Sequence, residues 1–541
     1  MDLASVNPNQ PTTASLTSPA VRSSPANALL GLVFCLISAA YFYAAIAKSR
    51  STDLWLDEIL SVSAARLASP AQIWLAIKNG SDFNPPAYDL LLHFFTRAVG
   101  AHGHLVWRIP SILAVYGAAL TTYALVRKHL TPLVALLAFG LVLDSELFDF
   151  ADQARQYALL AFGLALALWL WNNFPQTRFP KLQIFALWLT LSVCLCLHFY
   201  GVIEVAAIGV AEILWWLSRR QFRPGIWLAL LLTIPVEAAW VPLAAHLASF
   251  NRANIVSPEF FARPTVTSFI NTIYEVMLAA RNGSLLFLAG LTLIGLAALL
   301  QRSGAARRSA IGPWLHEDLP AADRPEFTLS RLEIIMLSLF SLPFITFVFS
   351  VVVTKAFATR YTIGAALLFA IGPAVMLNYL PSRRLVALLL LPLLLGTLIS
   401  RAHTPNPIIS VPITNALRIL QTPRPAGPVV VGEAMLYIEL MEAADPETRS
   451  NLVYLRRPQD APNPDPTDEN LVISLATFHP EYRVYDPAAF LAQNRNFYLI
   501  TLPGASIDTT TPSLVQHGLI GGLVNEQGDA ELFRAASAVS D

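Results

Sequence analysis

The chain has 541 residues, of which 55% are hydrophobic and 13% are charged, and its mean hydropathy is +0.53. This apolar content exceeds what the core of a soluble protein needs, so we predict a polytopic α-helical membrane protein. The 36 basic residues balance 36 acidic residues, which excludes a strongly basic protein built to bind nucleic acid. Cys35, Cys194 and Cys196 all lie in apolar runs, which excludes a disulfide framework.

Residues 1–26 are rich in Ser, Thr, Pro and Asn and are predicted to form a disordered cytoplasmic tail. The apolar run from Ala26 to Ala47 is longer than the core of a signal peptide and has no small-residue cleavage site, so we interpret it as a retained first helix. The transmembrane domain is expected to cover residues 27–402 with about eleven spanning helices. The further spanning runs are residues 109–126, 132–148, 154–173, 182–199, 200–217, 225–246, 284–301, 332–354, 361–380 and 385–400.

The run of residues 87–99 is too short to assign by length, and the basic residues decide its position. If this run does not span, five basic clusters all lie on the same side as the N-terminus, as the positive-inside rule requires. Residues 49–107 are therefore predicted to form an extracytoplasmic loop with interfacial helices, one of which begins at Pro85-Pro86. Lys48 and Arg50, just after the first helix, are local exceptions to the positive-inside rule in this orientation. The five clusters are Arg127/Lys128, Arg178/Lys181, Arg219/Arg220/Arg223, Arg302/Arg307/Arg308 and Arg383/Arg384.

Residues 403–541 have a different character from the preceding helices. A proline-rich linker leads into short apolar runs that alternate with helical stretches, a pattern that predicts a small α/β domain. By the parity of the spanning runs, this domain is extracytoplasmic, and we expect it to cover the site or to receive the acceptor. The predicted strands are Val429–Val431, Leu452–Leu455, Arg483–Tyr485, Phe497–Thr501 and a weaker run near Leu523.

Acidic, basic and aromatic residues gather in the segments predicted to lie on the outer face. Taken alone, each is equally well explained as a solvated charge, a helix anchor or a hydrogen-bonded residue at a helix end. Together they provide the groups that bind an anionic headgroup and deprotonate a hydroxyl beside it. They are Asp57, Glu58, Asp82, Asn84, Tyr88, Arg108, Asp152, Arg155, Tyr157, His198, Lys355, Arg360 and Tyr361.

The order of these residues resembles the GT-C superfamily of polyprenyl-phosphate-sugar-dependent glycosyltransferases. The resemblance is greatest to the bacterial branch that includes the protein O-mannosyltransferases, the lipid A aminoarabinose transferase and the rhizobial lipopolysaccharide core transferases. It extends from about residue 50 to residue 370. The motifs are Asp57-Glu58, Asp82-Phe83-Asn84-Pro85-Pro86-Ala87-Tyr88, Arg108-Ile109-Pro110-Ser111, Gln153-Ala154-Arg155-Gln156-Tyr157, His198-Phe199-Tyr200 and Arg360-Tyr361.

The resemblance implies transfer of a sugar from a polyprenyl phosphate to a hydroxyl of a glycan, lipid or protein outside the cytoplasm, in a bacterial inner membrane. It implies Asp57 as the general base, with Glu58 orienting the acceptor, and a single displacement that inverts the anomeric carbon. Cations facing the lipid phosphate stabilise the leaving group. The expected phosphate-binding residues are Arg155, Arg360, Lys355 and Tyr361. The expected positioning residues are Asp82, Asn84, Tyr88, Arg108, Asp152, Tyr157 and His198.

Three positions depart from the family pattern. Asn84 stands where relatives usually have His, Ala87 where they have Leu, and Gln153 where they have Glu. The change at Gln153 puts a metal-ligand or second-acid role there in doubt, and the neighbouring Asp152 is the alternative. No cofactor is certain from the sequence, and a divalent metal stays open.

Two other classes of function remain open at this stage. A lipid or glycan transporter or flippase would also have many helices, but it should show polar or broken helices near the midplane and two related halves. A non-catalytic assembly or sensor protein would account for the C-terminal domain. It would leave the acids, arginines and histidine on one face unexplained.

Overall fold

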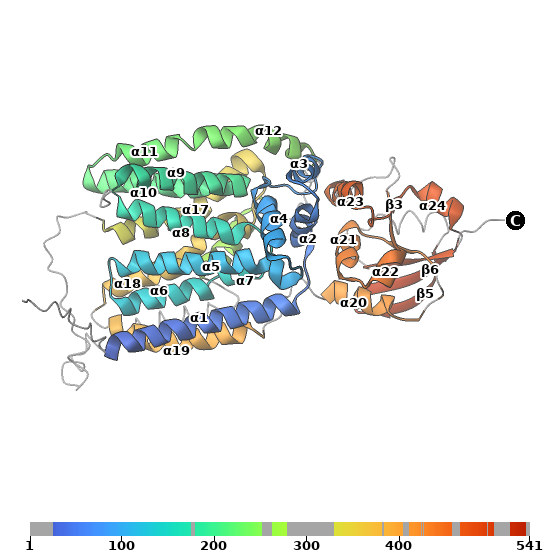
Figure 1. Cartoon of the computed structure of the whole chain (residues 1–541), viewed down its shortest axis with the longest axis horizontal. Helices are drawn as coiled ribbons and strands as arrows, with labels where there is room; N and C mark the ends of the chain where they lie inside the picture. Colours follow the sequence, from blue (N-terminus) through green and yellow to red (C-terminus); the bar gives the residue numbers. More distant parts are fainter. Residues whose placement is uncertain are drawn as a thin grey trace, which may run out of the picture.

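The computed structural model of the chain is a bundle of long helices with a small α/β domain at one end (Figure 1). The predicted tail and the predicted span at 284–301 fall largely or wholly outside the described residues. The structure describes residues 25–174, 179–250, 262–278, 329–380, 383–403, 411–423, 425, 427–456, 466–494, 496–502 and 520–536.

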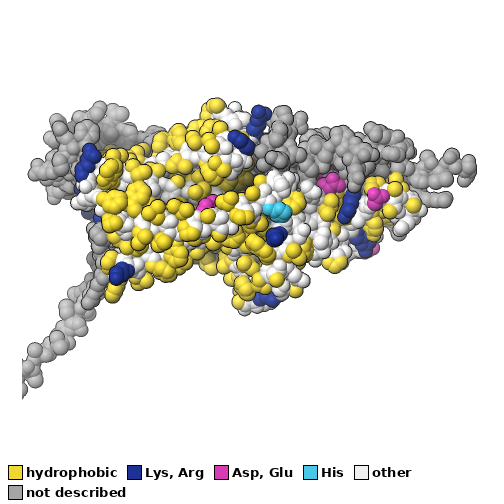
Figure 2. Space-filling model, turned by 90° about the horizontal axis from the view of Figure 1, so that it is seen from above, with side chains coloured by type: hydrophobic (Ala, Val, Ile, Leu, Met, Phe, Trp, Pro, Cys, Tyr) yellow, Lys and Arg dark blue, Asp and Glu magenta, His cyan; other side chains and the backbone are white. Residues whose placement is uncertain are grey.

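Ten of the predicted spanning runs form apolar helical segments in the described part of the chain. Eight segments are long and apolar enough to cross a membrane, and α6 and α8 are shorter apolar helices. In Figure 1 they lie side by side, and Figure 2 shows hydrophobic side chains over most of the visible bundle surface. The chain is therefore an integral membrane protein. The helices of these segments are α1 (Pro25–Ser51), α5 (His104–Arg127), α6 (Pro132–Asp144), α8 (Tyr157–Asn173), α9 (Pro180–Leu197), α10 (Val202–Arg219), α11 (Pro224–Leu231), α12 (Ile234–Phe250), α17 (Arg331–Phe349), α18 (Leu368–Asn378) and α19 (Arg383–Arg401). A further helix, α14 (Val266–Leu278), lies outside these segments in the sequence.

Local sequence signals explain where several of these helices begin. Pro132, Pro180 and Pro224 occupy the first turns of α6, α9 and α11, where the missing N–H of proline costs no hydrogen bond. At the start of α17, the hydroxyl of Ser330 accepts from the backbone N–H of Glu333, whose carboxylate accepts from the Ser330 N–H. Between α17 and α18 the chain continues through a π-helical turn (Ser350–Thr354) and a 3-10 segment, η4 (Thr359–Leu367).

Short helices cover one end of the bundle, between the spanning helices and the α/β domain (Figure 1). They are α2 (Leu56–Arg66), α3 (Pro70–Lys78), α4 (Ala87–Val99) and α7 (Leu147–Ala151). The run of residues 87–99 is an amphipathic helix of 13 residues that ends at Gly100 in the left-handed conformation. Residues 52–103 between α1 and α5 thus contain short helices and no segment long and apolar enough to span a membrane, as predicted, whereas residues 49–51 and 104–107 of the predicted loop belong to α1 and α5.

A buried charge network fixes this end of the bundle and explains one local exception to the positive-inside pattern. The Lys48 Nζ atom lies 2.8 Å from Asp149 Oδ1 and 3.4 Å from Asp152 Oδ2, so its charge is neutralised within the protein. Arg401 of α19 lies 3.1 Å from Asp144 of α6 and 3.6 Å from Asp149. These contacts join α1, α6, α7 and α19 where their ends meet.

The C-terminal domain contains one six-stranded sheet with the strand order β3-β2-β1-β4-β6-β5. The first four strands in this order run parallel, and β6 and β5 complete the sheet in antiparallel pairing. The strands are β1 (Val429–Val431), β2 (Leu452–Leu455), β3 (Val484–Tyr485), β4 (Asn496–Thr501), β5 (Ile520–Gln527) and β6 (Ala530–Ala536). The helices are α20 (Val411–Leu420), α21 (Ala434–Ala443), α22 (Pro446–Asn451), α23 (Pro466–Phe478) and α24 (Pro487–Gln493).

The parallel strands β1, β2 and β4 are almost fully buried, which is why their sequences are rich in apolar residues, whereas the edge strand β3 is partly exposed. Val429 and Val431 pack in the cluster that contains α21, whereas Val430 packs with Phe490 of α24 and Phe497. β1 and β2 have the predicted bounds, β3 and β4 each differ by one residue at their start, and the weaker run near Leu523 is β5, but β6 was not predicted. The feature that indicates β6 is the two-residue link between β5 and β6, where Gly528 has a φ of +63°.

Candidate functional site

Asp57 lies in the first turn of α2, at the end of the bundle that faces the C-terminal domain. Its carboxylate is 19% exposed, and the Oδ2 atom lies 3.6 Å from the Nη1 atom of Arg360 on η4, which is 23% exposed. Two residues 303 positions apart in the sequence thus form a partly exposed pair of opposite charge. Such a pair offers a base and an anion-binding group at one place.

Glu58, the other predicted catalytic acid, is fully buried. Its Oε1 atom accepts from Arg108 Nε at 2.8 Å and from the Ala154 N–H at 2.6 Å, and its Oε2 atom accepts from Arg108 Nη2 at 2.7 Å. The remaining Arg108 donors bond the backbone carbonyls of Ser49, Thr52 and Asp53. This geometry joins α2 to α5 and to the segment before α8. We therefore interpret Glu58 and Arg108 as positioning residues and not as groups that orient the acceptor.

Arg155 and Asp82 form a second buried pair directly behind Asp57. The Arg155 Nη1 atom donates to Asp82 Oδ2 at 2.6 Å, to Ser61 Oγ at 2.7 Å and to the Asp57 carbonyl at 2.9 Å. The other Asp82 oxygen accepts from Asn84 Nδ2 at 2.7 Å. Arg155 is predicted to bind the donor phosphate, and in the structure its Nη1 atom also holds the backbone of the residue that carries the candidate base.

His198 lies in a group of aromatic rings beside Arg360. Its ring centroid is 5.6 Å from both Tyr157 and Tyr361, and the rings of Tyr200 and Tyr361 stack at 4.3 Å. The His198 Nδ1 atom accepts from the Tyr200 N–H at 2.9 Å. Burial, with the nearby positive charges of Arg155 and Arg360, lowers the pKa of His198 to about 3. The imidazole is therefore neutral at physiological pH.

Two aromatic rings lie beside the Arg360 guanidinium. Its carbon atom is 6.0 Å from the Trp55 ring centroid and 5.7 Å from the Tyr361 ring centroid. The Trp55 Nε1 donor is buried and has no hydrogen-bond partner among the described residues. Trp55 was not predicted as a site residue, because its neighbour Asp57 gave the stronger signal. An indole beside an acidic pair at a helix start is the feature that would have indicated it.

Three predicted residues lie apart from the Asp57–Arg360 pair. Lys355 is exposed, has a φ of +59° and donates to the Val351 carbonyl. Tyr88 is buried with its hydroxyl 3.4 Å from Ser111 Oγ. Asp152 is buried beside Lys48, and burial raises the pKa of its carboxyl to about 6.

Asp89 was not among the predicted site residues. It is buried on α4, and burial together with the neighbouring charge of Asp82 raises the pKa of its carboxyl well above the ordinary value. Its position directly after the last residue of the predicted motif, Tyr88, explains the omission. Because Asp89 faces the Asp82–Arg155 pair, it belongs to the support of the site.

The candidate acids do not converge as metal ligands. Among the described residues, no group of three or more His, Cys, Asp or Glu side chains is placed to hold a metal ion. Glu58 is bonded to Arg108, and Asp152 lies beside Lys48. The protein groups nearest to Asp57 and Glu58 are therefore arginines and backbone groups.

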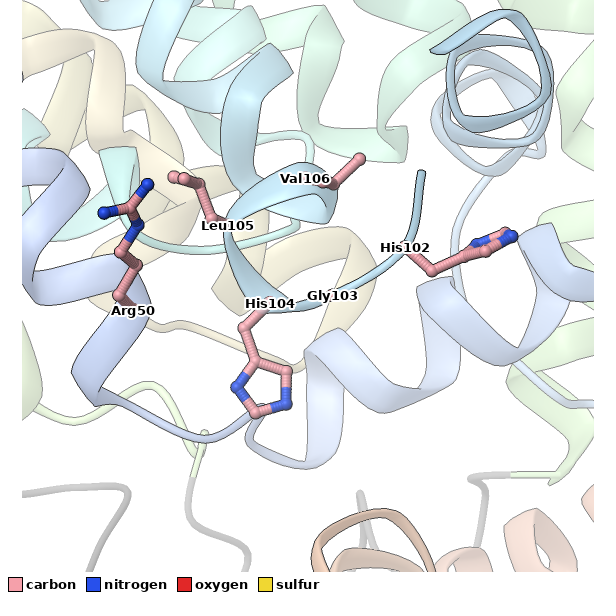
Figure 3. Close-up of a pocket in the computed structure, with 6 residues that line it drawn as sticks. All are labelled: Arg50, His102, Gly103, His104, Leu105 and Val106. Carbon is pink, nitrogen blue, oxygen red and sulfur yellow. The ribbon is translucent and has the colours of Figure 1, made fainter. Parts of the chain in front are cut away.

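A separate open cavity of about 380 Å³ lies where α1 ends and α5 begins (Figure 3). It is lined by Arg50, His102, Gly103, His104, Leu105 and Val106. The His104 Nδ1 atom lies 3.9 Å from Asp53 Oδ1. None of the predicted site residues lines this cavity, so we do not assign it to the candidate site.

Comparison of the sequence with protein-family models and with curated proteins finds no match. Comparison of the structure with solved structures finds ArnT from Cupriavidus metallidurans in the apo state, with 14% sequence identity and a TM-score of 0.57 over 94% of this chain and 99% of ArnT. ArnT bound to undecaprenyl phosphate matches with 13% identity and a TM-score of 0.54 over 94% of this chain and 98% of ArnT.

The oligosaccharyltransferase of Archaeoglobus fulgidus, in complex with Zn and sulfate, is a more distant match. It has 14% identity and a TM-score of 0.46 over 86% of this chain and 68% of the oligosaccharyltransferase. The likeness of ArnT to this chain extends over almost the full length of both proteins. The chain therefore has the fold of ArnT, in agreement with the polytopic helical fold and C-terminal α/β domain predicted from the sequence.

Proposed function

We propose that this protein is a membrane-bound inverting glycosyltransferase that moves a sugar from a polyprenyl phosphate to an acceptor hydroxyl. The observation that carries the proposal is the contact of Asp57 with Arg360, because the two side chains are partly exposed while the charges behind them are buried and paired. Asp57 is the proposed base, and Arg360 is the proposed ligand of the donor phosphate.

The ion pair itself suggests how donor binding prepares the base. A phosphate that binds the Arg360 guanidinium competes with Asp57 for the same cation, since both are anions. Once the phosphate takes that partner, the Asp57 carboxylate becomes available to accept a proton from a hydroxyl. Donor binding and base activation are then two results of one exchange of partners.

The chemical step is a single displacement. The acceptor oxygen forms a bond to the anomeric carbon as its proton passes to Asp57, and the bond between that carbon and the phosphate oxygen breaks with its electron pair on the phosphate. Arg360 stabilises this developing charge, and the Trp55 N–H is a second donor close to the guanidinium. Attack from the face opposite the phosphate inverts the configuration.

The likeness to ArnT supports the lipid-linked donor, because that enzyme has been solved bound to undecaprenyl phosphate. The five basic clusters support an extracytoplasmic position for Asp57 and for the α/β domain of residues 403–541. A bacterial inner membrane, with the site on its periplasmic face, is the setting we propose. The acceptor class is a cell-envelope glycan, lipid or protein.

Purified protein in proteoliposomes tests the proposal. A panel of radiolabelled polyprenyl-phosphate sugars is supplied with total envelope lipid, glycan and protein fractions as acceptors, and transfer of label is measured. Wild type should transfer label from at least one donor, and an Asp57→Asn variant in parallel should not. Transbilayer movement of a labelled donor without any transfer product would overturn the proposal and favour the flippase alternative.

A further inference from the structure

The C-terminal domain contacts the helix that carries Asp57. Helix α21 lies against α2, and α23 lies against α3 (Figure 1). At the C-terminal end of α2, the guanidinium of Arg66 donates to both carboxylate oxygens of Glu442 on α21, each at 2.7 Å. The Arg66 guanidinium also lies 5.6 Å from the centroid of the Trp107 ring. Arg66 thus connects the α/β domain, α2 and the start of α5.

The Arg66–Glu442 pair has the geometry of a strong ion pair. Its two parallel hydrogen bonds match the planar fork of arginine to a carboxylate. The Glu442 side chain is 14% exposed, so water competes for its oxygens only in part. Burial raises the pKa of this carboxyl, but the hydrogen bonds and charge of Arg66 outweigh it, and the pKa is lowered.

Further contacts connect the domain to the rest of α2. At its first turn, the Glu439 side chain lies next to the backbone N–H of Leu56, the residue before Asp57. In the middle of the helix, Ser63 lies next to Tyr482 and His479. The domain therefore contacts both ends and the centre of a helix of 11 residues.

The opposite side of α2 is held by the transmembrane bundle. Glu58 bonds Arg108 of α5, and the Asp57 carbonyl accepts from Arg155. The candidate phosphate ligand, Arg360, lies on η4 and does not belong to α2. The distance between Asp57 and Arg360 therefore depends on the position of α2. The C-terminal domain contacts one side of α2 and so helps to fix this position.

We propose that the C-terminal domain positions Asp57 by clamping α2 against the bundle, with Arg66 and Glu442 as positioning residues. The proposal rests on the transferase function proposed above. Arg66 is nine residues from Asp57, about 13 Å along the helix, and so acts through the helix and not on the reacting atoms. Loss of the clamp should therefore slow turnover more than it weakens donor binding.

The test is a charge exchange with two readouts. The variants Arg66→Glu and Glu442→Arg each place like charges together, and the double variant restores an opposite pair. In proteoliposomes, each single variant should lower kcat about tenfold or more, because small misplacement of a reacting group is costly. The donor KM should change less than about threefold, since Arg360 is not moved, and the double variant should recover most of kcat.

A thiol at position 57 gives the second readout without any turnover. In a background with the three cysteines changed to Ser, the reaction rate of Asp57→Cys with a charged methanethiosulfonate reagent reports the position of α2. Each single exchange should raise this rate, and the double exchange should return it towards the reference. Arg534→Glu and Glu526→Arg are matched controls, because both residues are exposed in the same domain on β6 and β5. Both should leave the rate and kcat unchanged.

Two results would overturn the clamp. Single exchanges that alter neither the thiol rate nor kcat would show that the contact does not hold α2. Single exchanges that the double variant does not rescue would show that the effect does not come from this pair. A wild type that transfers no sugar would instead overturn the proposed transferase function, and the thiol rate would still decide whether the domain positions α2.

Discussion

The Oδ2 atom of Asp57 lies 3.6 Å from the Nη1 atom of Arg360, and each side chain keeps about a fifth of its surface exposed. The neighbouring ionic pairs behave differently, since Glu58–Arg108 and Asp82–Arg155 are almost fully buried. Buried pairs hold the loops and helices in place, and the exposed pair is the one that a substrate can reach. We therefore propose that the site divides into a reactive pair, Asp57 and Arg360, and a supporting network of buried pairs.

Asp57→Asn should abolish most of the transfer activity while leaving the fold intact. The amide has the same shape as the carboxylate but cannot accept the proton, and loss of a general base lowers turnover by about a hundredfold or more. Turnover in proteoliposomes and thermal unfolding in detergent are the two measurements. An Asp57→Asn variant that transfers sugar at the wild-type rate would remove Asp57 from the role of base.

Glu58→Gln should destabilise the protein rather than act on chemistry alone. The change leaves the fully buried Arg108 without its counter-charge, and breaking such a pair costs about 3–5 kcal/mol. Thermal unfolding and the yield of monodisperse protein should both fall, with Asp57→Asn as the control of unchanged stability. Normal stability together with lost transfer would instead place Glu58 in the chemical step.

The low pKa of His198 predicts a pH dependence of stability. The folded-state pKa is about 3 and the ordinary value is 6.5, so below pH 6.5 the unfolded chain binds a proton that the folded protein does not. Stability contributed by the neutral ring is therefore lost as pH falls, at about 1.4 kcal/mol per pH unit. His198→Asn keeps an acceptor for the Tyr200 N–H and should lose less stability between pH 7.5 and 5.5. If wild type and His198→Asn lost equal stability over this pH range, the low folded-state pKa of His198 would be contradicted.

Much of the fold could be predicted because its signals are local. Long apolar runs specify spanning helices, and short apolar runs between turn residues specify the parallel strands of the C-terminal domain. The β5–β6 hairpin was only half predicted, since the missed strand β6 (Ala530–Ala536) has only Leu532 and Phe533 as large apolar residues, flanked by the charged Glu531 and Arg534. The prediction is weakest where pairing with a neighbouring strand, rather than the sequence of the strand, determines the structure.

The roles within the site could be predicted only in part. The motifs indicated Glu58 and Arg108 separately, but their pairing joins residues 50 positions apart and depends on how α2 packs on α5. The same holds for Lys48, which counted against the predicted orientation until its contacts with Asp149 and Asp152 were known. A sequence shows which charges are present, whereas the partners of those charges come from tertiary packing.

The proposed orientation predicts which exposed positions an impermeant thiol reagent can reach in intact cells. In a cysteine-free background, Asn79→Cys and Glu447→Cys should be labelled, because they lie at the end of the bundle that carries Asp57 or in the C-terminal domain. Arg220→Cys, in a basic cluster at a helix end, should stay protected until the membrane is permeabilised. The opposite pattern would reverse the proposed orientation.

Arg360→Lys should impair both donor binding and turnover, although the positive charge is kept. A phosphate is held by the planar fork of arginine through two oxygens, and an ammonium group offers only a point charge. Because the contact exists in the ground state and strengthens as the leaving group gains charge, donor affinity and kcat should both fall.

The alternative role for Arg360 is a helix anchor at the membrane surface, and it makes a different prediction. An anchor needs only the charge and a long side chain, so lysine would replace arginine without loss and only Arg360→Ala would disturb insertion. Lys355→Arg is a matched control, since Lys355 is exposed, lies nearby in sequence and donates from its ammonium group to the Val351 carbonyl. Donor affinity and kcat for properly inserted Arg360→Lys therefore separate the two roles, and wild-type values for both would leave Arg360 an anchor.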